Sequence, residues 1–317
     1  MKWPWNHNTK PEPLPFRLRP FDPATGGITV GKLANGNDAT LIVTNTSGVV
    51  VGGIPGSGKT AGMMIIVLAL YLSGCCRIHV VDGKGGDDWT WFEKYASTFV
   101  RDDLDTVHDI LLRLDDEMKR RIASMRQRYG SSNYWNISPD NRPPLEVVII
   151  DECQTYFDTK GILGGKPAKD KAMEITAAAT DIVKKGRSGG YLLFAITQKP
   201  TTDSLPSALR DNCENRICFR VKTPEAARAV LGDLPDGSPS PTDIPPSRRG
   251  GAIIGLATGE DVMCRFAYVS EEEAERVRRE ARTQPGRGPH PETAPAPHTA
   301  HAIGTQRAGI RRHRPEI

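Results

Sequence analysis

The chain has 317 residues, of which 38% are hydrophobic and 25% are charged, and this is enough to form one large core with tails. Its 42 Lys and Arg residues against 38 Asp and Glu residues give a net charge of +4, too weak to indicate nucleic-acid binding without local basic patches. The most apolar stretch, Ala61 to Leu72, is too short to span a bilayer, and no secretion signal is present. These features favour a cytoplasmic protein without a direct membrane span.

Residues 1–27 are predicted to form an extended arm, because prolines are mixed there with aromatic side chains. The aromatic residues are Trp3, Trp5, Phe16 and Phe21. We expect them to pack on the core of the same chain, and docking on a neighbouring subunit is the alternative. Residues 28–282 are predicted to form the main folded domain.

A glycine-rich segment lies between a short apolar strand, Val49 to Val51, and a helix-length run from Ala61 to Leu72. Its glycine spacing and its Lys-Thr pair match a phosphate-binding loop, for which a glycine-rich surface turn is the alternative. In such a loop backbone N–H groups face the phosphates, the lysine reaches the β and γ oxygens, and the threonine hydroxyl ligates Mg²⁺. The sequence therefore predicts a nucleoside triphosphate and Mg²⁺ bound by Gly53, Ile54, Pro55, Gly56, Ser57, Gly58, Lys59, Thr60 and Ala61.

The apolar run from Ile78 to Val81 is predicted to be a strand of the same sheet, and it ends in a glycine-rich turn at 82–86. Lys84 in this turn is a candidate contact to phosphate or DNA, although a solvated lysine is the commoner outcome. Apolar residues at three-and-four spacing from Leu104 to Met125 predict an amphipathic helix. Its far end carries a first basic patch, either a DNA contact or a solvated face, made of Lys119, Arg120, Arg121, Arg126 and Arg128.

The run from Leu145 to Ile150 is predicted to be a buried parallel strand that ends in two acids, Asp151 and Glu152. A carboxylate beside the γ-phosphate is required to polarise the attacking water, and a second carboxylate holds the metal shell. We therefore predict Asp151 as a Mg²⁺ ligand and Glu152 as the general base. Two solvent-facing acids that close a strand are the alternative.

The Lys- and Gly-rich segment at 158–171 is predicted to be a mobile loop suited to phosphate contacts along a duplex. A second basic patch follows at Lys184, Lys185 and Arg187. The strand predicted from Tyr191 to Thr197 ends at Gln198, where the carboxyl edge of the sheet is expected to meet the nucleotide. Gln198 is the candidate γ-phosphate sensor, and a glutamine that begins a loop is the alternative.

The carboxyl-terminal part is predicted to contain a hairpin, with strands at 252–256 and 262–269, followed by a short helix. Ser270 and Glu273 form a capping-box signature at the start of that helix. Residues 283–317 are rich in Pro, His and Arg without apolar periodicity, which predicts a disordered tail. The six cysteines include no Cys-x-x-Cys pair, which favours reduced core cysteines over a zinc site or a catalytic thiol.

Segments between residues 28 and 268 resemble the FtsK/SpoIIIE branch of the HerA-FtsK P-loop ATPases. The matching stretches are GIPGSGKT at 53–60, VVDGKGG at 80–86, DDEMKRR at 115–121, NYWN at 133–136, VVIIDE at 147–152, GRSGGYLLFAITQKP at 186–200 and NRICFRV at 215–221. Cys153 and Gln154 stand where the cell-division translocases carry small apolar residues. In this respect the chain resembles actinomycete plasmid-transfer proteins of the TraB type or phage-borne relatives.

The resemblance implies an α/β P-loop NTPase fold of the RecA-like kind, with a mostly parallel central sheet and helices on both faces. It also implies ATP as the nucleotide and an oligomeric ring, usually hexameric, that moves double-stranded DNA in plasmid transfer or DNA segregation. In such rings an arginine of the neighbouring subunit completes each active site. Arg187 is the first candidate for this role and Arg216 the second, with Arg210 and Arg220 as alternatives.

Two other functions are compatible with the same motifs. Type VII secretion ATPases share the module and move proteins, and a nucleotide-gated DNA-binding scaffold would bind ATP without turnover. Because no membrane span is predicted, attachment to a membrane or a transfer apparatus would require a partner protein or the amino-terminal arm.

Overall fold

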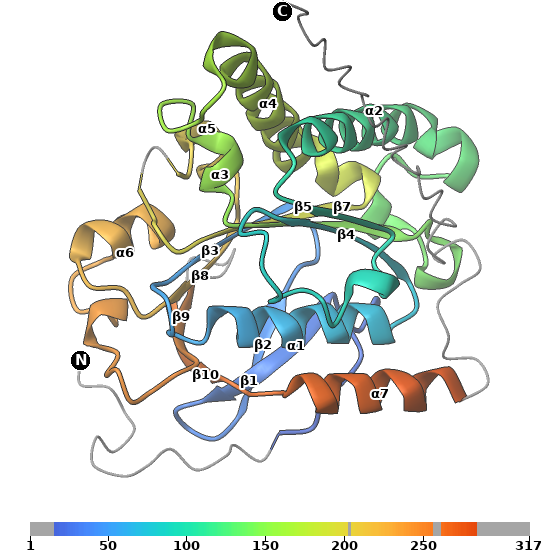
Figure 1. Cartoon of the computed structure of the whole chain (residues 1–317). Helices are drawn as coiled ribbons and strands as arrows, with labels where there is room; N and C mark the ends of the chain where they lie inside the picture. Colours follow the sequence, from blue (N-terminus) through green and yellow to red (C-terminus); the bar gives the residue numbers. More distant parts are fainter. Residues whose placement is uncertain (1–15, 202–203, 256–260, 284–317) are drawn as a thin grey trace, which may run out of the picture.

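The computed structural model describes residues 16–201, 204–255 and 261–283 (Figure 1). Its strands are β1 (Gly27–Leu33), β2 (Asp38–Ile42), β3 (Gly48–Gly52), β4 (Cys76–Asp82), β5 (Thr98–Arg101), β6 (Leu145–Asp151), β7 (Tyr191–Thr197), β8 (Asn215–Phe219), β9 (Gly251–Gly255) and β10 (Asp261–Phe266). They form one ten-stranded sheet in the order β2-β1-β10-β9-β8-β3-β7-β6-β4-β5. The predictions for residues 1–15, for the hairpin turn at 256–260 and for the tail after 283 lie outside the described residues.

Among the described strands, the six neighbours from β8 to β5 run parallel. β3, β6 and β7 are buried along their whole length, as expected for parallel strands that are covered on both faces. The four predicted strands of this region are confirmed as β3, β4, β6 and β7. β7 lies between β3, which leads into the phosphate-binding loop, and β6, which ends in the acidic pair, so both motifs reach the same edge of the sheet.

The antiparallel strands β9, β10, β1 and β2 extend the sheet beyond β8. The predicted carboxyl-terminal hairpin is confirmed as β9 and β10, whereas the sequence did not predict β1 and β2. Phe21 is buried just before β1, and its N–H donates to the carbonyl oxygen of Ala69 at 2.8 Å. Phe16 also packs against the core, which confirms the expected packing for these two aromatic residues of the arm.

Helices cover both faces of the sheet, which confirms the α/β architecture (Figure 1). The longer elements are α1 (Lys59–Leu72), α2 (Leu104–Tyr129), α4 (Gly165–Gly189), α6 (Pro224–Leu231) and α7 (Glu271–Thr283), and α3 (Gln154–Phe157) and α5 (Ser207–Arg210) are single turns. Four 3₁₀ turns within the described residues lie at Glu93–Tyr95, Tyr134–Asn136, Pro139–Asn141 and Pro241–Asp243. In Figure 1, α2 and α4 lie side by side on one face, and α1 and α7 lie on the other.

The apolar sequence of α1 is explained by its position, since the helix is buried on nearly every side and contacts β1, β4 and α7. In α2 the predicted stripe faces the core, and the buried members are Val107, Leu111, Leu114, Met118 and Met125. At the start of α7 the N–H of Glu273 donates to the hydroxyl oxygen of Ser270 at 3.2 Å, which confirms the predicted cap. Within the described residues no helix combines the length and the apolar character needed to cross a membrane.

The prediction of a mobile loop throughout 158–171 is wrong for its second half. α4 begins at Gly165, because Ala168, Ala172 and further small apolar residues recur at helical spacing and are buried. Lys171 ties this first part of α4 to α2 through an ion pair with Asp105 at 2.6 Å.

Candidate functional site

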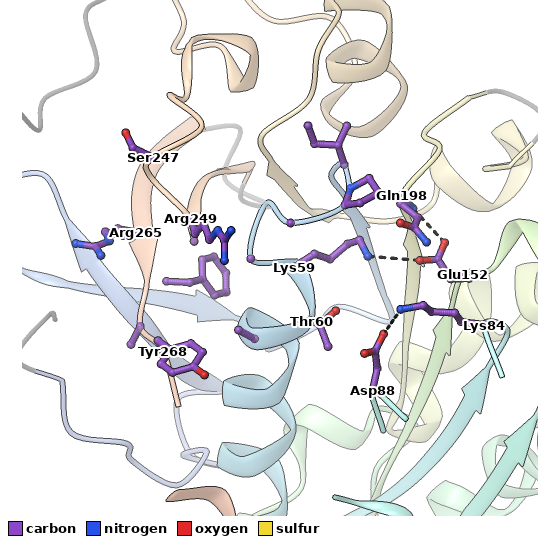
Figure 2. Close-up of a pocket in the computed structure, with 18 residues that line it drawn as sticks. Lys59, Thr60, Lys84, Asp88, Glu152, Gln198, Ser247, Arg249, Arg265 and Tyr268 are labelled. Carbon is purple, nitrogen blue, oxygen red and sulfur yellow. Dashed lines mark hydrogen bonds and ion pairs between the residues drawn. The ribbon is translucent and has the colours of Figure 1, made fainter. Parts of the chain in front are cut away.

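A cavity of about 630 Å³ lies over the start of α1, at the carboxyl ends of the parallel strands (Figure 2). One side is formed by the phosphate-binding loop and by side chains from the ends of β6 and β7. The opposite side is formed by the segment before β9 and by the end of β10. The lining residues are Ile54, Pro55, Gly56, Gly58, Lys59, Thr60, Ala61, Lys84, Asp88, Glu152, Gln198, Ser247, Arg249, Gly250, Arg265, Phe266, Ala267 and Tyr268.

Gly58 gives the phosphate-binding loop its shape. Its φ of +101° lies in the left-handed region, and a Cβ atom at this position would be 2.5 Å from the Gly250 nitrogen. The N–H of Gly250 donates to the carbonyl oxygen of Ser57 at 2.8 Å, so the loop is bonded to the strand that follows. This arrangement leaves the first N–H groups of α1 at the cavity, where helix geometry favours an anion.

Lys59 and Glu152 meet on one side of the cavity, with Nζ 3.6 Å from Oε1, and both side chains are buried (Figure 2). Glu152 has a φ of +50°, which a residue with a side chain rarely adopts outside functional sites. This turn in the backbone follows the last residue of β6 and directs the carboxylate towards the loop. Gln198 lines the same region, and its N–H donates to Glu152 Oε2 at 3.4 Å.

Asp151 is buried beside the cavity and does not line it. Its Oδ2 accepts a hydrogen bond from Trp89 Nε1 at 2.7 Å, and its Oδ1 accepts one from the Glu152 N–H at 3.0 Å. Asp82 lies opposite Asp151 on the neighbouring strand. Burial raises the pKa of the Asp82 carboxyl, and the nearby charge of Asp151 adds to this increase.

The oxygen donors of this region suit Mg²⁺. Thr60 presents its side chain to the cavity. Each carboxylate oxygen of Asp151 retains a second lone pair beside the bond that it already accepts. The described residues contain no cluster of three or more Asp, Glu, His or Cys side chains that would form a metal cage. Mg²⁺ takes few protein ligands and keeps water and substrate phosphates, so the Thr60 hydroxyl and the Asp151 carboxylate are the residues that would hold it.

Lys84 also reaches the cavity, but its ammonium is already engaged. Lys84 Nζ lies 2.6 Å from Asp88 Oδ2, and this hydrogen bond raises the pKa of the lysine. Gly53 and Ser57 belong to the predicted loop without lining the cavity, and Ser57 is buried. The other predicted loop residues line the cavity, as do Glu152 and Gln198.

Arg187 and Arg216 lie far from the cavity of their own chain. Arg187 is exposed near the end of α4, and Arg216 is the second residue of β8, so both lie at the amino edge of the parallel strands. Arg216 Nε and Nη2 donate to the carbonyl oxygens of Cys213 and Arg210, each at 3.4 Å. In the described part of the chain, Arg187 has no ion-pair partner.

The two basic patches predicted from the sequence meet on the outer surface of α2 and α4. A groove of about 400 Å³ between these helices is lined by Lys119, Lys184 and Lys185. Asp181 pairs with Lys119 at 3.1 Å and with Lys185 at 2.7 Å, so part of the positive charge is neutralised. A second pocket of about 380 Å³ adjoins the end of α2, and its basic lining residues are Arg77, Arg120, Arg121 and Arg128.

Among the side chains in and around the cavity that sequence reasoning missed, three bear on the proposed chemistry. Arg249 and Tyr268 line the side opposite Lys59, and Tyr268 is 78% exposed. Trp89 was missed as the hydrogen-bond donor to Asp151. None of the three carries a local motif, because each reaches the site through the folding of a distant segment.

The chain is similar in sequence to several known proteins. No protein-family model matches the chain. A sporulation regulatory protein of Streptomyces azureus is 27% identical over 205 residues, which cover 63% of this chain and 65% of that protein. The DNA translocase FtsK of Helicobacter pylori is 25% identical over 217 residues, which cover 64% of this chain and 24% of the translocase. The chain therefore spans less than two thirds of either relative.

Solved structures support the fold. The pCW3 conjugation coupling protein TcpA, solved with ATPγS, superposes with a TM-score of 0.71 at 21% identity and covers 85% of this chain and 74% of its own. The cytoplasmic domain of the Thermomonospora curvata type VII secretion ATPase EccC gives a TM-score of 0.64 at 25% identity, over 89% of this chain and 33% of its own. The relatives and the solved structures thus agree on an FtsK-like P-loop ATPase module.

Proposed function

We propose that this chain, a homologue of the FtsK/SpoIIIE-type DNA translocases, hydrolyses ATP and uses the energy to move double-stranded DNA. The observation that carries the proposal is the meeting of Lys59 and Glu152, 3.6 Å apart, in a cavity that also contains the phosphate-binding loop. A cation for the phosphates and a carboxylate for the attacking water are the two groups that hydrolysis requires side by side.

In the proposed reaction the loop N–H groups and Lys59 hold the β and γ phosphates. Glu152 orients a water molecule and takes its proton while the water oxygen bonds to the γ-phosphorus and the bond to the β-phosphate oxygen breaks. Gln198 contacts the γ-phosphate from the end of β7. Thr60 and Asp151 would hold Mg²⁺, which supplies charge neutralisation at the phosphates.

The nucleoside of ATP is assigned to the side of the cavity opposite Glu152. With the γ-phosphate between Lys59 and Glu152, the α-phosphate lies towards Thr60 and Ala61, and the nucleoside continues towards Arg249 and Tyr268 (Figure 2). Tyr268 offers an exposed aromatic face on which a nucleobase can stack. Arg249 is exposed on the segment that is bonded to the loop through Gly250, and it adds positive charge above the phosphates.

Arg187 is proposed to act on the nucleotide of a neighbouring subunit in a ring, usually hexameric. A cation supplied in trans stabilises the charge of the transition state and couples hydrolysis to the adjacent subunit. Arg187 suits this role better than Arg216, because it is exposed whereas Arg216 donates to two backbone carbonyls. Both lie too far from the cavity of their own chain to act there.

Double-stranded DNA is the proposed cargo, and the basic surface of α2 and α4 supplies candidate phosphate contacts. Exposed basic residues of this surface include Arg120, Arg126, Lys184 and Arg187. Because phosphate contacts carry little sequence information, we expect sequence-tolerant binding that weakens strongly with salt. Plasmid transfer or DNA segregation, with a transfer-apparatus or membrane partner, is the proposed setting, and the cytoplasm the proposed location.

The structural match to the type VII secretion ATPase supports a second candidate, an ATPase that moves proteins. ATPase turnover with and without long duplex DNA separates the two. We expect DNA to stimulate turnover of the wild-type chain and to leave Glu152→Gln inactive. Turnover that DNA does not change would favour protein transport, and ATP binding without turnover under all conditions would favour a nucleotide-gated scaffold.

A further inference from the structure

Gln154 connects Glu152 to the end of β7. Its Nε2 donates to Glu152 Oε2 at 2.6 Å, and its Oε1 accepts a hydrogen bond from the Thr197 hydroxyl at 2.7 Å. Thr197 is fully buried and immediately precedes Gln198. A chain of two hydrogen bonds therefore joins the carboxylate to the strand that carries the proposed phosphate sensor.

The orientation of the Gln154 amide follows from the chemistry of its neighbours. An ionised carboxylate only accepts hydrogen bonds, so the amide group that faces Glu152 has to be the NH₂. Its carbonyl oxygen then faces Thr197, whose hydroxyl oxygen accepts the Lys199 N–H at 3.0 Å and uses its own proton to donate. The donor and acceptor roles of Glu152, Gln154 and Thr197 are therefore all fixed by their hydrogen-bond partners.

The backbone around Gln154 is held on both sides. The N–H of Cys153 donates to the carbonyl oxygen of Ile196 on β7 at 2.9 Å. The hydroxyl of Thr155 donates to the carbonyl oxygen of Gly83 after β4 at 3.0 Å. Because Gln154 begins the short helix α3 between these two anchors, its side chain is positioned before any substrate binds.

Lys59 cannot bind the phosphates and keep its ion pair with Glu152 at the same time. When the phosphates attract Lys59, the carboxylate loses the ion pair at 3.6 Å and keeps its bonds to Gln154 and to the Gln198 N–H. The hydrogen bond from Gln154, at 2.6 Å, is shorter than the one from the Gln198 N–H, at 3.4 Å. Gln154 is thus the side chain that fixes the carboxylate at the stage when it has to orient water.

We propose that Gln154 is a positioning residue, which holds the Glu152 carboxylate where it can take a proton from the attacking water and links it, through Thr197, to the end of β7. This inference rests on the proposed ATP hydrolysis. It gives a role to Gln154, one of the two residues that stand where the translocases resembled by this sequence carry small apolar residues.

Steady-state kinetics test the proposal through the split between kcat and KM. We expect Gln154→Ala to lower kcat by about 10- to 100-fold, the effect of losing one hydrogen bond to a charged group, while KM for ATP changes little. Thr197→Val should lower kcat in the same direction, and Thr197→Ser, which keeps the hydroxyl, should retain it. A kcat for Gln154→Ala equal to that of the wild type would overturn the proposal.

The double variant Gln154→Ala/Thr197→Val separates a shared path from two independent structural effects. If both residues act on Glu152 through one chain, the double variant should turn over no more slowly than Gln154→Ala alone. Effects that multiply would contradict the link to β7.

A second measurement does not depend on turnover or on nucleotide binding. In crystals of Lys59→Ala, which imitates the departure of the lysine, Glu152 should stay ordered on Gln154. In crystals of Lys59→Ala/Gln154→Ala the carboxylate should leave that position or lose order, and an unchanged carboxylate would refute the proposal. A wild-type protein without turnover would refute ATP hydrolysis instead, and these crystals would still decide the role of Gln154.

Discussion

Lys59 and Glu152, the proposed phosphate ligand and the proposed general base, form a buried ion pair with Nζ 3.6 Å from Oε1. One residue starts α1 and the other follows β6, and β7 lies between the two strands that lead to them. The pair means that each residue restrains the other until phosphates compete for the lysine. In the proposed mechanism, binding of the triphosphate and release of the base from its ion pair are therefore one event.

Replacing Glu152 separates these two functions. Glu152→Gln should lower kcat by at least about 100-fold, the usual contribution of a general base, because the amide cannot accept the proton of water. The affinity for ATP should be retained or increased, since Lys59 loses its charged competitor. Binding of a fluorescent ATP analogue and single-turnover hydrolysis measure the two effects. As the matched control, Lys59→Ala should lose binding, and normal turnover in Glu152→Gln would exclude this residue as the base.

Trp89 is expected to position the proposed metal ligand Asp151. Trp89→Phe removes the donor to Asp151 Oδ2 and leaves an aromatic side chain in the same core position. Loss of such a supporting hydrogen bond typically weakens metal affinity by about 10-fold or more, so the Mg²⁺ concentration for half-maximal ATPase activity should rise. Trp91→Phe, a change in a neighbouring buried tryptophan, is the control and should leave the Mg²⁺ dependence unchanged.

Tyr268 is expected to contribute to nucleotide affinity through its ring. Tyr268→Ala should raise KM for ATP by roughly 3- to 10-fold, the energy of one aromatic contact, and should leave kcat nearly unchanged. Tyr268→Phe keeps the ring and should behave as the wild type. Equal KM values for the alanine and phenylalanine variants would show that the nucleobase lies elsewhere.

Mixed assemblies test the action of Arg187 on a neighbour. Arg187→Ala subunits retain an intact cavity, whereas Lys59→Ala subunits retain the arginine, and each protein alone should be almost inactive. Mixing them should restore part of the ATPase activity, because some interfaces then pair an intact cavity with an intact arginine. The same mixture prepared with Lys59→Ala/Arg216→Ala as the arginine donor identifies any contribution of Arg216. A mixture as inactive as its components would rule out action in trans by Arg187.

Cys75 is expected to be the most reactive of the six thiols. Its hydrogen bond with the Cys76 thiol lowers the pKa of Cys75 to about 7, and Cys75 is only half-buried, whereas the other five cysteines are buried. The thiolate is the nucleophile, so alkylation of Cys75 should increase as the pH rises through 7 and level off above it. Mass spectrometry after brief iodoacetamide treatment locates the label. In Cys76→Ala, which removes the hydrogen-bond donor, the rise should move to higher pH.

Much of the parallel sheet was predictable from short apolar runs. β3, β4, β6 and β7 are buried along nearly their whole length, so each contains a run of mostly apolar residues. β1 and β2 were not predictable, because they are partly exposed and interrupted by polar residues and glycine. β1 also depends on pairing with β10, which comes from the other end of the folded region.

The candidate site also has a part that was predictable from the sequence and a part that was not. The phosphate-binding loop and the Asp-Glu pair are visible in the sequence, since the chemistry requires fixed residue types at fixed local spacing. Arg249, Tyr268 and Trp89 are not, because their positions depend on how distant segments fold against α1 and β6. The link from Gln154 to Thr197 likewise requires the adjacency of β6 and β7.

By itself, the sequence determined which residues are candidates for the phosphate and acid-base chemistry and which segments form the buried strands β3, β4, β6 and β7, because both depend on near neighbours along the chain. Only the tertiary structure decided that Lys59 pairs with Glu152, that Gln154 joins the base to β7, and that Arg187 lies away from its own cavity. These relationships depend on the order of strands in the sheet, which is set by packing between segments that are far apart in sequence.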